Sequence, residues 1–385
     1  MPPLPRPFGD LKVALQRDGW WPFLPNAMMA WLLLALGGGG VFLTWVLESY
    51  APWAPWLLVW APIALAALLA ANLVFDLVTV RLGLPSPRAT PSRRDGPDGL
   101  DGFDQLRARV SCRSFAPRPL RSTHHVELLS AAAHHSTAAE RLGDQSVRLE
   151  YIQAHIPLAS VVGAQEFLVA VVPRDVERTT VIDAARAMQH VVHHATGMGL
   201  ATCWLGPDAE LDAVEAALGD RFDDRHDRVL CVCAVGYASP FLPLGLRVLA
   251  AMQHHRWPMD ELFGVDTSLP PYNAFGRCYE VCQWAPSVLN RQLARARLRL
   301  RDDEVERVDF FVTVDDRFEG PLDLGVWLAN WEIGCEELGM EGHFVVWPHT
   351  TAAVALGSPT DPRVDVSWVR YGRRTSRRDS TRSSG

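Results

Sequence analysis

Lysine is almost absent from this sequence: Lys12 is the only one, and arginine supplies the rest of the 37 basic residues. With 44 acidic residues the formal net charge is −7, which argues against a protein that holds nucleic acid on a strongly basic surface. Hydrophobic residues make up 48% of the chain and charged residues 21%, so the chain as a whole is not intrinsically disordered. We therefore expect a folded protein with no nucleic-acid partner.

Several ligand-binding and catalytic motifs are also missing. No G-x-G-x-x-G follows an expected strand, so a Rossmann nucleotide site has no support. No G-x-S-x-G is present, so the sequence gives no support for a serine hydrolase of the class that carries this motif. Four glycines at 37–40 precede no Lys-Ser/Thr pair, so they do not form a phosphate loop and instead favour close helix packing.

The cysteines and histidines lack the spacing of a metal site. Seven cysteines are an odd number without a framework pattern, so we expect reduced thiols. His190, His193 and His194 complete no H-E-x-x-H and are expected to be packed or solvated side chains. Adjacent residues do not face each other on a helix, which applies to the histidine pairs at 124–125, 134–135 and 254–255. The sequence therefore predicts no metal ligand.

Two long uncharged runs stand near the N-terminus. Residues 27–47 carry no charge over 21 positions, which spans about 30 Å as a helix, the thickness of the hydrocarbon layer. A second uncharged run follows at 51–75, after a loop of three residues. Both runs exceed a signal-peptide core and no small-residue cleavage site follows the first. We expect a transmembrane hairpin within 27–80; a pair of apolar core helices is the alternative.

The charged residues beside the hairpin predict its orientation. Basic residues precede it within the N-terminal segment 1–26 and follow it at 81–94, whereas the loop between the runs carries Glu48 and no base. Basic flanks stay on the cytoplasmic side of a membrane. We therefore expect a multi-pass cell-membrane protein with two spans, whose soluble domain and both termini are cytoplasmic.

Helix and strand signals alternate in the remainder, between a Pro-, Gly- and Ser-rich flexible linker at 83–102 and a basic disordered tail at 370–385. The mixture predicts an α+β domain with a central sheet wrapped by helices. Expected helices cover 124–139, 180–196, a stretch opening at 208, 274–284 and 322–338; expected strands cover 167–172, 200–205, 229–235, 308–314 and 343–347.

Three short segments carry residues suited to a ligand. R-V-S-C-R at 109–113 places two guanidinium groups and a hydroxyl at alternate positions, which an extended strand can direct at a phosphate and a polyol. G-M-G-L-A-T-C-W-L-G at 197–206 turns from a helix into a strand that stops at glycine, where backbone amides can approach a planar ligand. The third segment is A-P-S-V-L-N at 285–290.

In this order, and with V-G-Y at 235–237, the segments resemble the nitroreductase superfamily, and more narrowly the members in which two nitroreductase-like halves are fused in one chain. The resemblance covers about 105–350. It implies an FMN-dependent, nitroreductase-like fold that is an internally duplicated pseudo-dimer, with halves at 103–240 and 241–369. The implied FMN ligands are Arg109, Ser111 and Arg113 for phosphate and ribityl chain, Leu205 and Gly206 for the isoalloxazine, Pro286, Ser287 and Asn290 from the second half, and Arg247 as a further phosphate ligand.

The resemblance also implies a reaction: hydride passes from NADH or NADPH to the flavin, and a small-molecule acceptor such as a nitroaromatic or a quinone is then reduced. Because the flavin supplies this chemistry, no catalytic side chain is expected. The second half has no R-x-S-x-R ahead of 285, and the matching stretch of the first half, 131–136, lacks P-S-x-x-N, so we expect one FMN per chain and no need for a homo-oligomer. The family's Pro-Trp pair is missing from 291–295, which leaves a membrane-tethered flavin-binding or scaffolding protein with little turnover as the alternative.

Overall fold

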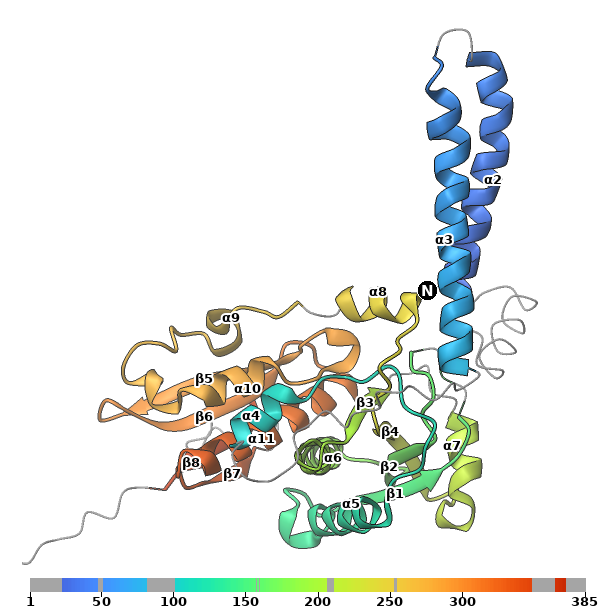
Figure 1. Cartoon of the computed structure of the whole chain (residues 1–385). Coiled ribbons are helices and arrows are strands. Elements are labelled where there is room, and N and C mark those ends of the chain that lie inside the picture. Colours follow the sequence, from blue (N-terminus) through green and yellow to red (C-terminus); the bar gives the residue numbers. More distant parts are fainter. Residues whose placement is uncertain are drawn as a thin grey trace, which may run out of the picture.

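The structure, a computed structural model, describes residues 23–47, 51–81, 101–156, 158, 160–205, 211–252, 255–347 and 364–371. Two antiparallel sheets flank a set of helices, and a helical hairpin rises from one side (Figure 1). The strands are β1 (Arg148–Gln153), β2 (Glu166–Pro173), β3 (Ala201–Leu205), β4 (Asp227–Gly236), β5 (Ala294–Arg301), β6 (Glu304–Val312), β7 (Gly342–Val346) and β8 (Val364–Arg370). The longer helices are α2 (Leu24–Leu47), α3 (Ala61–Asp76), α5 (Ser122–His135), α6 (Arg178–Gly197) and α11 (Glu319–Glu337). The shorter ones are η2 (Trp56–Trp60), η3 (Leu77–Arg81), α4 (Gly102–Ala108), η4 (Ala138–Glu140), α7 (Leu211–Leu218), η5 (Gly219–Arg221), α8 (Leu244–Met252), α9 (Met259–Phe263), η6 (Tyr272–Phe275), α10 (Arg277–Gln283) and η7 (Val288–Asn290).

The two sheets have the same strand order. The first is β1-β2-β4-β3 and the second is β5-β6-β8-β7, and all their pairings are antiparallel. In each, a long helix connects the second strand to the third along the chain: α6 follows β2 and α11 follows β6. The expected α+β architecture is confirmed. The internal duplication and its boundaries at 240 and 241 stay predictions, with which the repeated order agrees.

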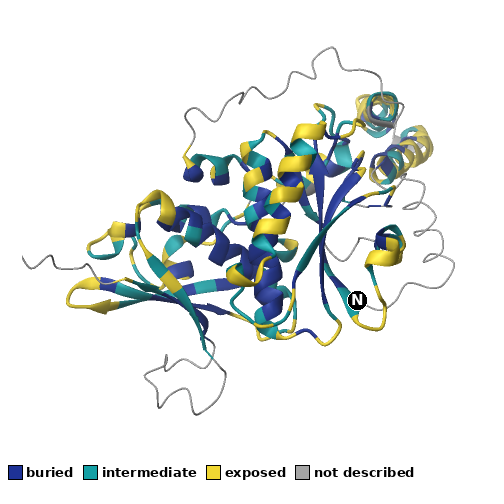
Figure 2. Cartoon of the chain, turned by 90° about the horizontal axis from the view of Figure 1, so that it is seen from below, coloured by how far each residue is buried: buried dark blue, intermediate teal, exposed yellow. Residues whose placement is uncertain are grey.

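The two halves meet where α6 crosses α11. A Cβ added to Gly325 of α11 would lie 2.2 Å from Ile182 O of α6, so only glycine permits this approach. At the same junction Arg178 donates twice to Asp365 of β8, at 2.5 and 3.1 Å, and that carboxylate is buried. Buried residues run through these central helices in Figure 2. The halves therefore share one continuous packed interior.

Each face of the first sheet has its own apolar cluster. One packs against α5 and α6, through residues such as Leu128 and Met188, and the other against α7, through residues such as Val214. The second sheet packs against α10 and α11, where Trp331 is fully buried. Helices therefore cover both faces of the first sheet, and the cluster on the second sheet reaches α6 through Ile182.

The N-terminal hairpin consists of α2 and the continuous helical run η2-α3-η3. Two stretches, Leu24–Trp45 and Trp56–Thr79, are long and apolar enough to cross a membrane, and only 17% and 11% of their most apolar windows are buried. Core helices are mostly buried, so this low burial favours the hairpin over a core pair, and the membrane-spanning hairpin stays a prediction. The glycine run does pack closely: a Cβ at Gly40 would lie 2.1 Å from Leu58 O.

Several expected boundaries differ from the structure. The first helix begins at Leu24, not 27, and the second continues past 75 to Arg81. Gly102, expected to end the linker, starts α4, because Asp101 Oδ1 accepts the N–H of Asp104 at 2.7 Å and Phe103 is buried. Of the linker, 83–100 lies outside the described residues, as do 1–22 of the N-terminal segment and 372–385 of the tail. Three strands, β1, β5 and β8, were not expected, since none of them contains the continuous apolar run by which the other strands were predicted.

Candidate functional site

The 109–113 stretch lies along the free edge of the first sheet. α4 ends at Ala108, and Arg109 takes an extended backbone. Ser111 then forms a parallel bridge with Thr202 of β3, and Cys112 N donates to Thr202 O at 2.8 Å. This edge position buries Arg109, which is 9% exposed, and brings its Nη1 to 3.5 Å from Ser111 Oγ. Arg109 and Ser111 therefore share one side of the extended stretch, as the alternation predicted.

Arg109 is a buried cation that fits an anionic ligand. Desolvation lowers its pKa to about 10, and the positive charge of nearby Arg256 acts in the same direction. Among the residues that the structure describes, no carboxylate forms an ion pair with Arg109. A buried charge is costly unless it is paired, so a bound phosphate would supply the missing partner.

Arg256 belongs to the second half and contacts both Asn290 and Trp284. Its Nη1 donates to Asn290 Oδ1 at 2.5 Å, and Asn290 Nδ2 donates to His255 O at 3.1 Å. Two guanidinium groups lie over the Trp284 ring, with Arg256 Cζ 5.4 Å and Arg107 Cζ 4.7 Å from the ring centroid. Segments near 109 and 290, far apart in the sequence, therefore meet through Arg256 and Trp284.

A cavity of about 360 Å³ opens where β3 ends. Leu205 pairs with Val232, and β4 continues beyond this pair without β3 beside it. The second half closes the other side of the cavity with Pro286 and Ser287. Apolar side chains supply most of its wall, as they do in small-molecule sites. The lining residues are Trp204, Leu205, Leu211, Arg228, Val229, Leu230, Cys231, Val232, Pro286, Ser287, Val288, Leu289, Phe318, Glu319, Leu322, Asp323 and Val326.

Asp323 of α11 holds the second-half loop in place. Its carboxylate accepts the N–H of Val288 at 2.7 Å and that of Leu293 at 3.0 Å, so both ends of the loop are attached to one side chain. Within the loop, Gln292 N donates to Ser287 Oγ at 3.1 Å. Burial raises the pKa of Asp323 to about 7, against the lowering effect of the two backbone donors.

The raised pKa of Asp323 predicts a pH-dependent stability. The folded protein binds this proton more tightly than the unfolded chain, whose carboxyl has a pKa of 3.8, so its contribution to stability falls as pH rises from 3.8 through about 7. Asp323→Asn removes the titration and keeps an acceptor. We expect the Tm of the wild type to fall relative to that of the variant over this window, measured by thermal melts. Parallel curves would contradict the assignment.

The structure does not bring the remaining expected FMN ligands, Arg113, Arg247 and Gly206, into described contact with Arg109 or Ser111. Arg113 Nη1 donates to Ser160 O at 3.0 Å. Arg247 is exposed on α8, and its Nε donates to Leu242 O at 2.8 Å. No described contact joins Arg247 to Arg109 or Ser111. Gly206 lies outside the described residues. The structure therefore groups Arg109 and Ser111 with Asn290, through the contacts of Arg107, Trp284 and Arg256, and it groups Leu205 with Pro286 and Ser287.

The family model described as "Putative TM nitroreductase" matches residues 102–335, which is more than half of the chain and contains both groups. The chain belongs to this nitroreductase family. By family, the protein is therefore an oxidoreductase.

Solved structures similar to this nitroreductase are distant in sequence. A "putative nitroreductase" from Thermotoga maritima is 15% identical, covering 72% of this chain and 97% of its own, with a TM-score of 0.44. Nitroreductases with bound FMN from Bacteroides fragilis and Desulfitobacterium hafniense are each 15% identical, covering 38% and 44% of this chain and 92% and 100% of theirs, with TM-scores of 0.31 and 0.32. No curated protein matches the chain.

Some residues of the candidate site could not be found from the sequence. Arg256 and Trp284 belong to no motif, and only the tertiary contacts bring them to Arg107 and Asn290. Asp323 gave a weak signal, since it is an acidic residue in the apolar helix expected at 322–338. A buried acid on an apolar helix commonly receives backbone N–H groups from a neighbouring loop.

Proposed function

We propose that this nitroreductase is a membrane-anchored, FMN-dependent oxidoreductase that transfers hydride from NADH or NADPH, through the flavin, to a small organic acceptor. The observation that carries the proposal is the series of contacts that runs from Arg107, two residues before Arg109, through the Trp284 ring and Arg256 to Asn290. It joins the phosphate-type stretch of the first half to the loop of the second half. When bound, FMN supplies the redox chemistry, and the chain supplies binding, orientation and electrostatics.

The donor set fits the cofactor. Arg109, Ser111 and Arg113 would hold the phosphate and ribityl chain by charge and hydrogen bonds. The buried position of Arg109 strengthens such a contact, because water competes less for the guanidinium. Arg247, which has an exposed place on α8, contributes to the proposal only as a further cation.

The apolar cavity provides a place for the planar ring. Leu205, at the end of β3, and the loop carrying Pro286 and Ser287 line opposite sides of it. Backbone N–H groups at 205–206 would stabilise negative charge on the reduced ring. One chain supplies both sides, so we infer one FMN per chain and no need for a second subunit.

The hairpin supports attachment to a membrane. Its exposed surface is apolar along both helices, with Trp31, Phe42 and Leu68 each more than half exposed. Water would disfavour such a surface, whereas lipid would cover it. The basic flanks favour an orientation in which the soluble domain and both termini are cytoplasmic. An acceptor that dissolves in lipid, such as a quinone, would reach this domain from the bilayer.

A second candidate function is a membrane-tethered flavin-binding or scaffolding protein with little turnover. The side chains that the family motif retains, Asn290 and Gln292, are engaged by the chain itself. Gln292 Nε2 donates to His255 O at 3.0 Å, and its Oε1 accepts Trp257 N at 3.1 Å. Together with the loss of the Pro-Trp pair at 293–294, this favours a site with altered substrate contacts.

The absorption spectrum of the detergent-solubilised full chain tests both functions. We expect yellow protein whose flavin bands bleach on anaerobic addition of NADH or NADPH and return when a nitroaromatic or a quinone is added. Yellow protein that neither nucleotide reduces would favour the scaffold. Protein that stays colourless after incubation with excess FMN would contradict both functions.

A further inference from the structure

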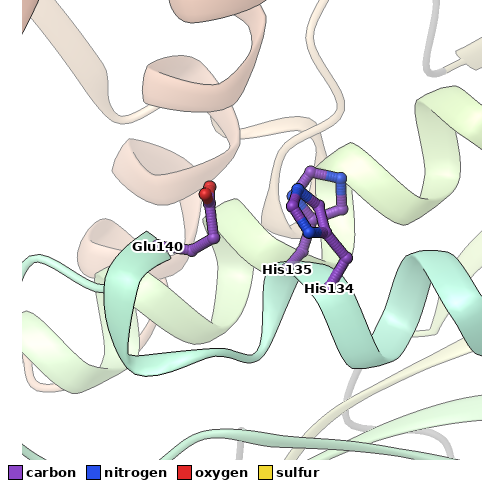
Figure 3. Close-up of side chains that lie close together, drawn as sticks. All are labelled: His134, His135 and Glu140. Carbon is purple, nitrogen blue, oxygen red and sulfur yellow. The ribbon is translucent and has the colours of Figure 1, made fainter.

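A cluster of three potential ligands lies at the end of α5, among residues that the proposed reaction does not use. His134 and His135 form the last turn of α5, and Glu140 ends the short η4 that follows (Figure 3). One ligand atom from each residue can be chosen so that all lie within 4.8 Å of one another. The two rings are 4.9 Å apart between centroids and tilted by 70°.

The expectation that adjacent histidines do not approach each other therefore fails at this pair. That rule describes the interior of a helix, where neighbouring side chains point in different directions. Here α5 ends at His135, and the chain turns back through η4, which brings Glu140 to both rings.

One histidine nitrogen gives a second, independent indication of a ligand. His135 Nδ1 is buried and has no hydrogen-bond partner among the residues that the structure describes. A buried polar atom that stays unsatisfied destabilises the fold, and a bound ligand would satisfy it. The ring of His190 stacks on His135 at 4.6 Å between centroids, with an angle of 11°, which fixes the orientation of the His135 ring.

The charges around the cluster permit a cation. Arg186 lies close, because it donates to Glu140 O, but it is paired with Glu332 at 2.8 Å. Glu332 also contacts His190, with Nε2 and Oε2 2.9 Å apart. Within the described chain, the Glu140 carboxylate has no ion-pair partner. One uncompensated negative charge therefore faces two imidazole rings.

We propose that His134, His135 and Glu140 bind a divalent transition-metal ion of the zinc type. Two imidazole nitrogens and one carboxylate oxygen are ligands that zinc accepts, with a water in the fourth position. Tetrahedral ligands at about 2.1 Å from the ion lie roughly 3.4 Å apart, so small side-chain rotations from the present separation complete the geometry. The ion would tie the end of α5 to η4, beside the contact of Arg186 with α11.

Metal titration of the intact chain tests this site. The protein is purified without a polyhistidine tag, stripped with a chelator, and titrated with Zn²⁺ by calorimetry and with Co²⁺ by absorption. We expect about one ion per chain with a Kd in the micromolar range or tighter. Zn²⁺ at about 100 times its Kd should then raise the Tm, because the ion binds only the folded state.

Matched histidine variants separate this site from the other histidines of the chain. The double variant His134→Ala/His135→Ala should weaken binding by at least about tenfold and lose the Zn²⁺-dependent rise in Tm. His135→Gln keeps the size of the side chain and serves as the test if the alanine variant folds poorly. It should likewise weaken Zn²⁺ binding and lose the Zn²⁺-dependent rise in Tm. His194→Ala, on the exposed side of α6, should bind as the wild type does. Equal affinity of all variants, or no binding by the wild type, would overturn the proposal. Neither readout depends on flavin or on turnover.

Discussion

The double variant Arg109→Glu/Arg113→Glu should purify without flavin. It places two carboxylates where a phosphate is to be bound and removes the buried positive charge of Arg109. Hydrogen bonds to charged groups contribute about 1.5–3 kcal/mol each, so losing two weakens FMN binding by about 100-fold or more. The measurement is the ratio of flavin to protein, from absorption at the flavin band, together with the rate of acceptor reduction by NADH and NADPH.

Two control variants distinguish a specific loss of FMN binding from a general loss of folding. Arg121→Glu reverses an exposed charge at the start of α5, outside the proposed phosphate site, and should keep its flavin. Arg109→Gln removes the buried charge without reversing it, and should bind FMN more weakly while its Tm stays close to that of the wild type. Flavin content and activity that survive the double reversal would remove the basis of the proposed function.

Removal of residues 1–82 should convert a membrane protein into a soluble one and separate two activities. The full chain should sediment with membranes and require detergent for extraction, whereas the shortened chain should remain in the supernatant. Activity with a water-soluble nitroaromatic should stay within about threefold, because the flavin site lies outside the hairpin, while activity with a membrane quinone should fall at least tenfold. The measurements are fractionation and the two reduction rates.

A second variant tests the hairpin within the complete chain. Leu65→Arg/Leu68→Arg places two charges on an exposed face of α3, and each costs about 2.5–3.5 kcal/mol at the centre of a bilayer. We expect this variant to leave the membrane fraction. Unchanged activity of the shortened chain towards membrane quinones would contradict the lipid-soluble acceptor, and a full chain found only in the supernatant would contradict the anchor.

The hairpin is also attached to the catalytic domain by specific contacts. Asp76 Oδ2 accepts the N–H of Leu244 at the start of α8 at 3.1 Å, and the Phe75 ring meets Phe241 edge-on at 5.8 Å between centroids. Figure 1 shows α8 lying at the base of the hairpin. These two contacts therefore hold the domain against the end of α3, in addition to the covalent connection along the chain.

The sequence by itself determined the parts of this protein that depend on local pattern. Uncharged runs of more than 20 residues require helices, because each helix satisfies its own backbone hydrogen bonds, and both helices are present. The apolar strands at 167–172 and 229–235 and the helices at 180–196 and 322–338 were predicted for the same reason, since their periodicity is set within each segment. The order of the motifs was enough to indicate the nitroreductase family.

Only the tertiary structure decided how these parts meet. No local pattern could bring Arg256 to Asn290 and to the Trp284 ring, attach the loop at 288–293 to Asp323, or bring His134, His135 and Glu140 to one point. These contacts depend on how helices cross and on where a strand ends. Both are determined by the packing of side chains from distant segments, which no single segment specifies. β5 went unpredicted although its residues alternate between apolar and charged, which is a strand pattern, because it lacks the continuous apolar run by which the other strands were expected. Its charges find partners only in the folded chain, as Arg299 does at Asp309 of β6.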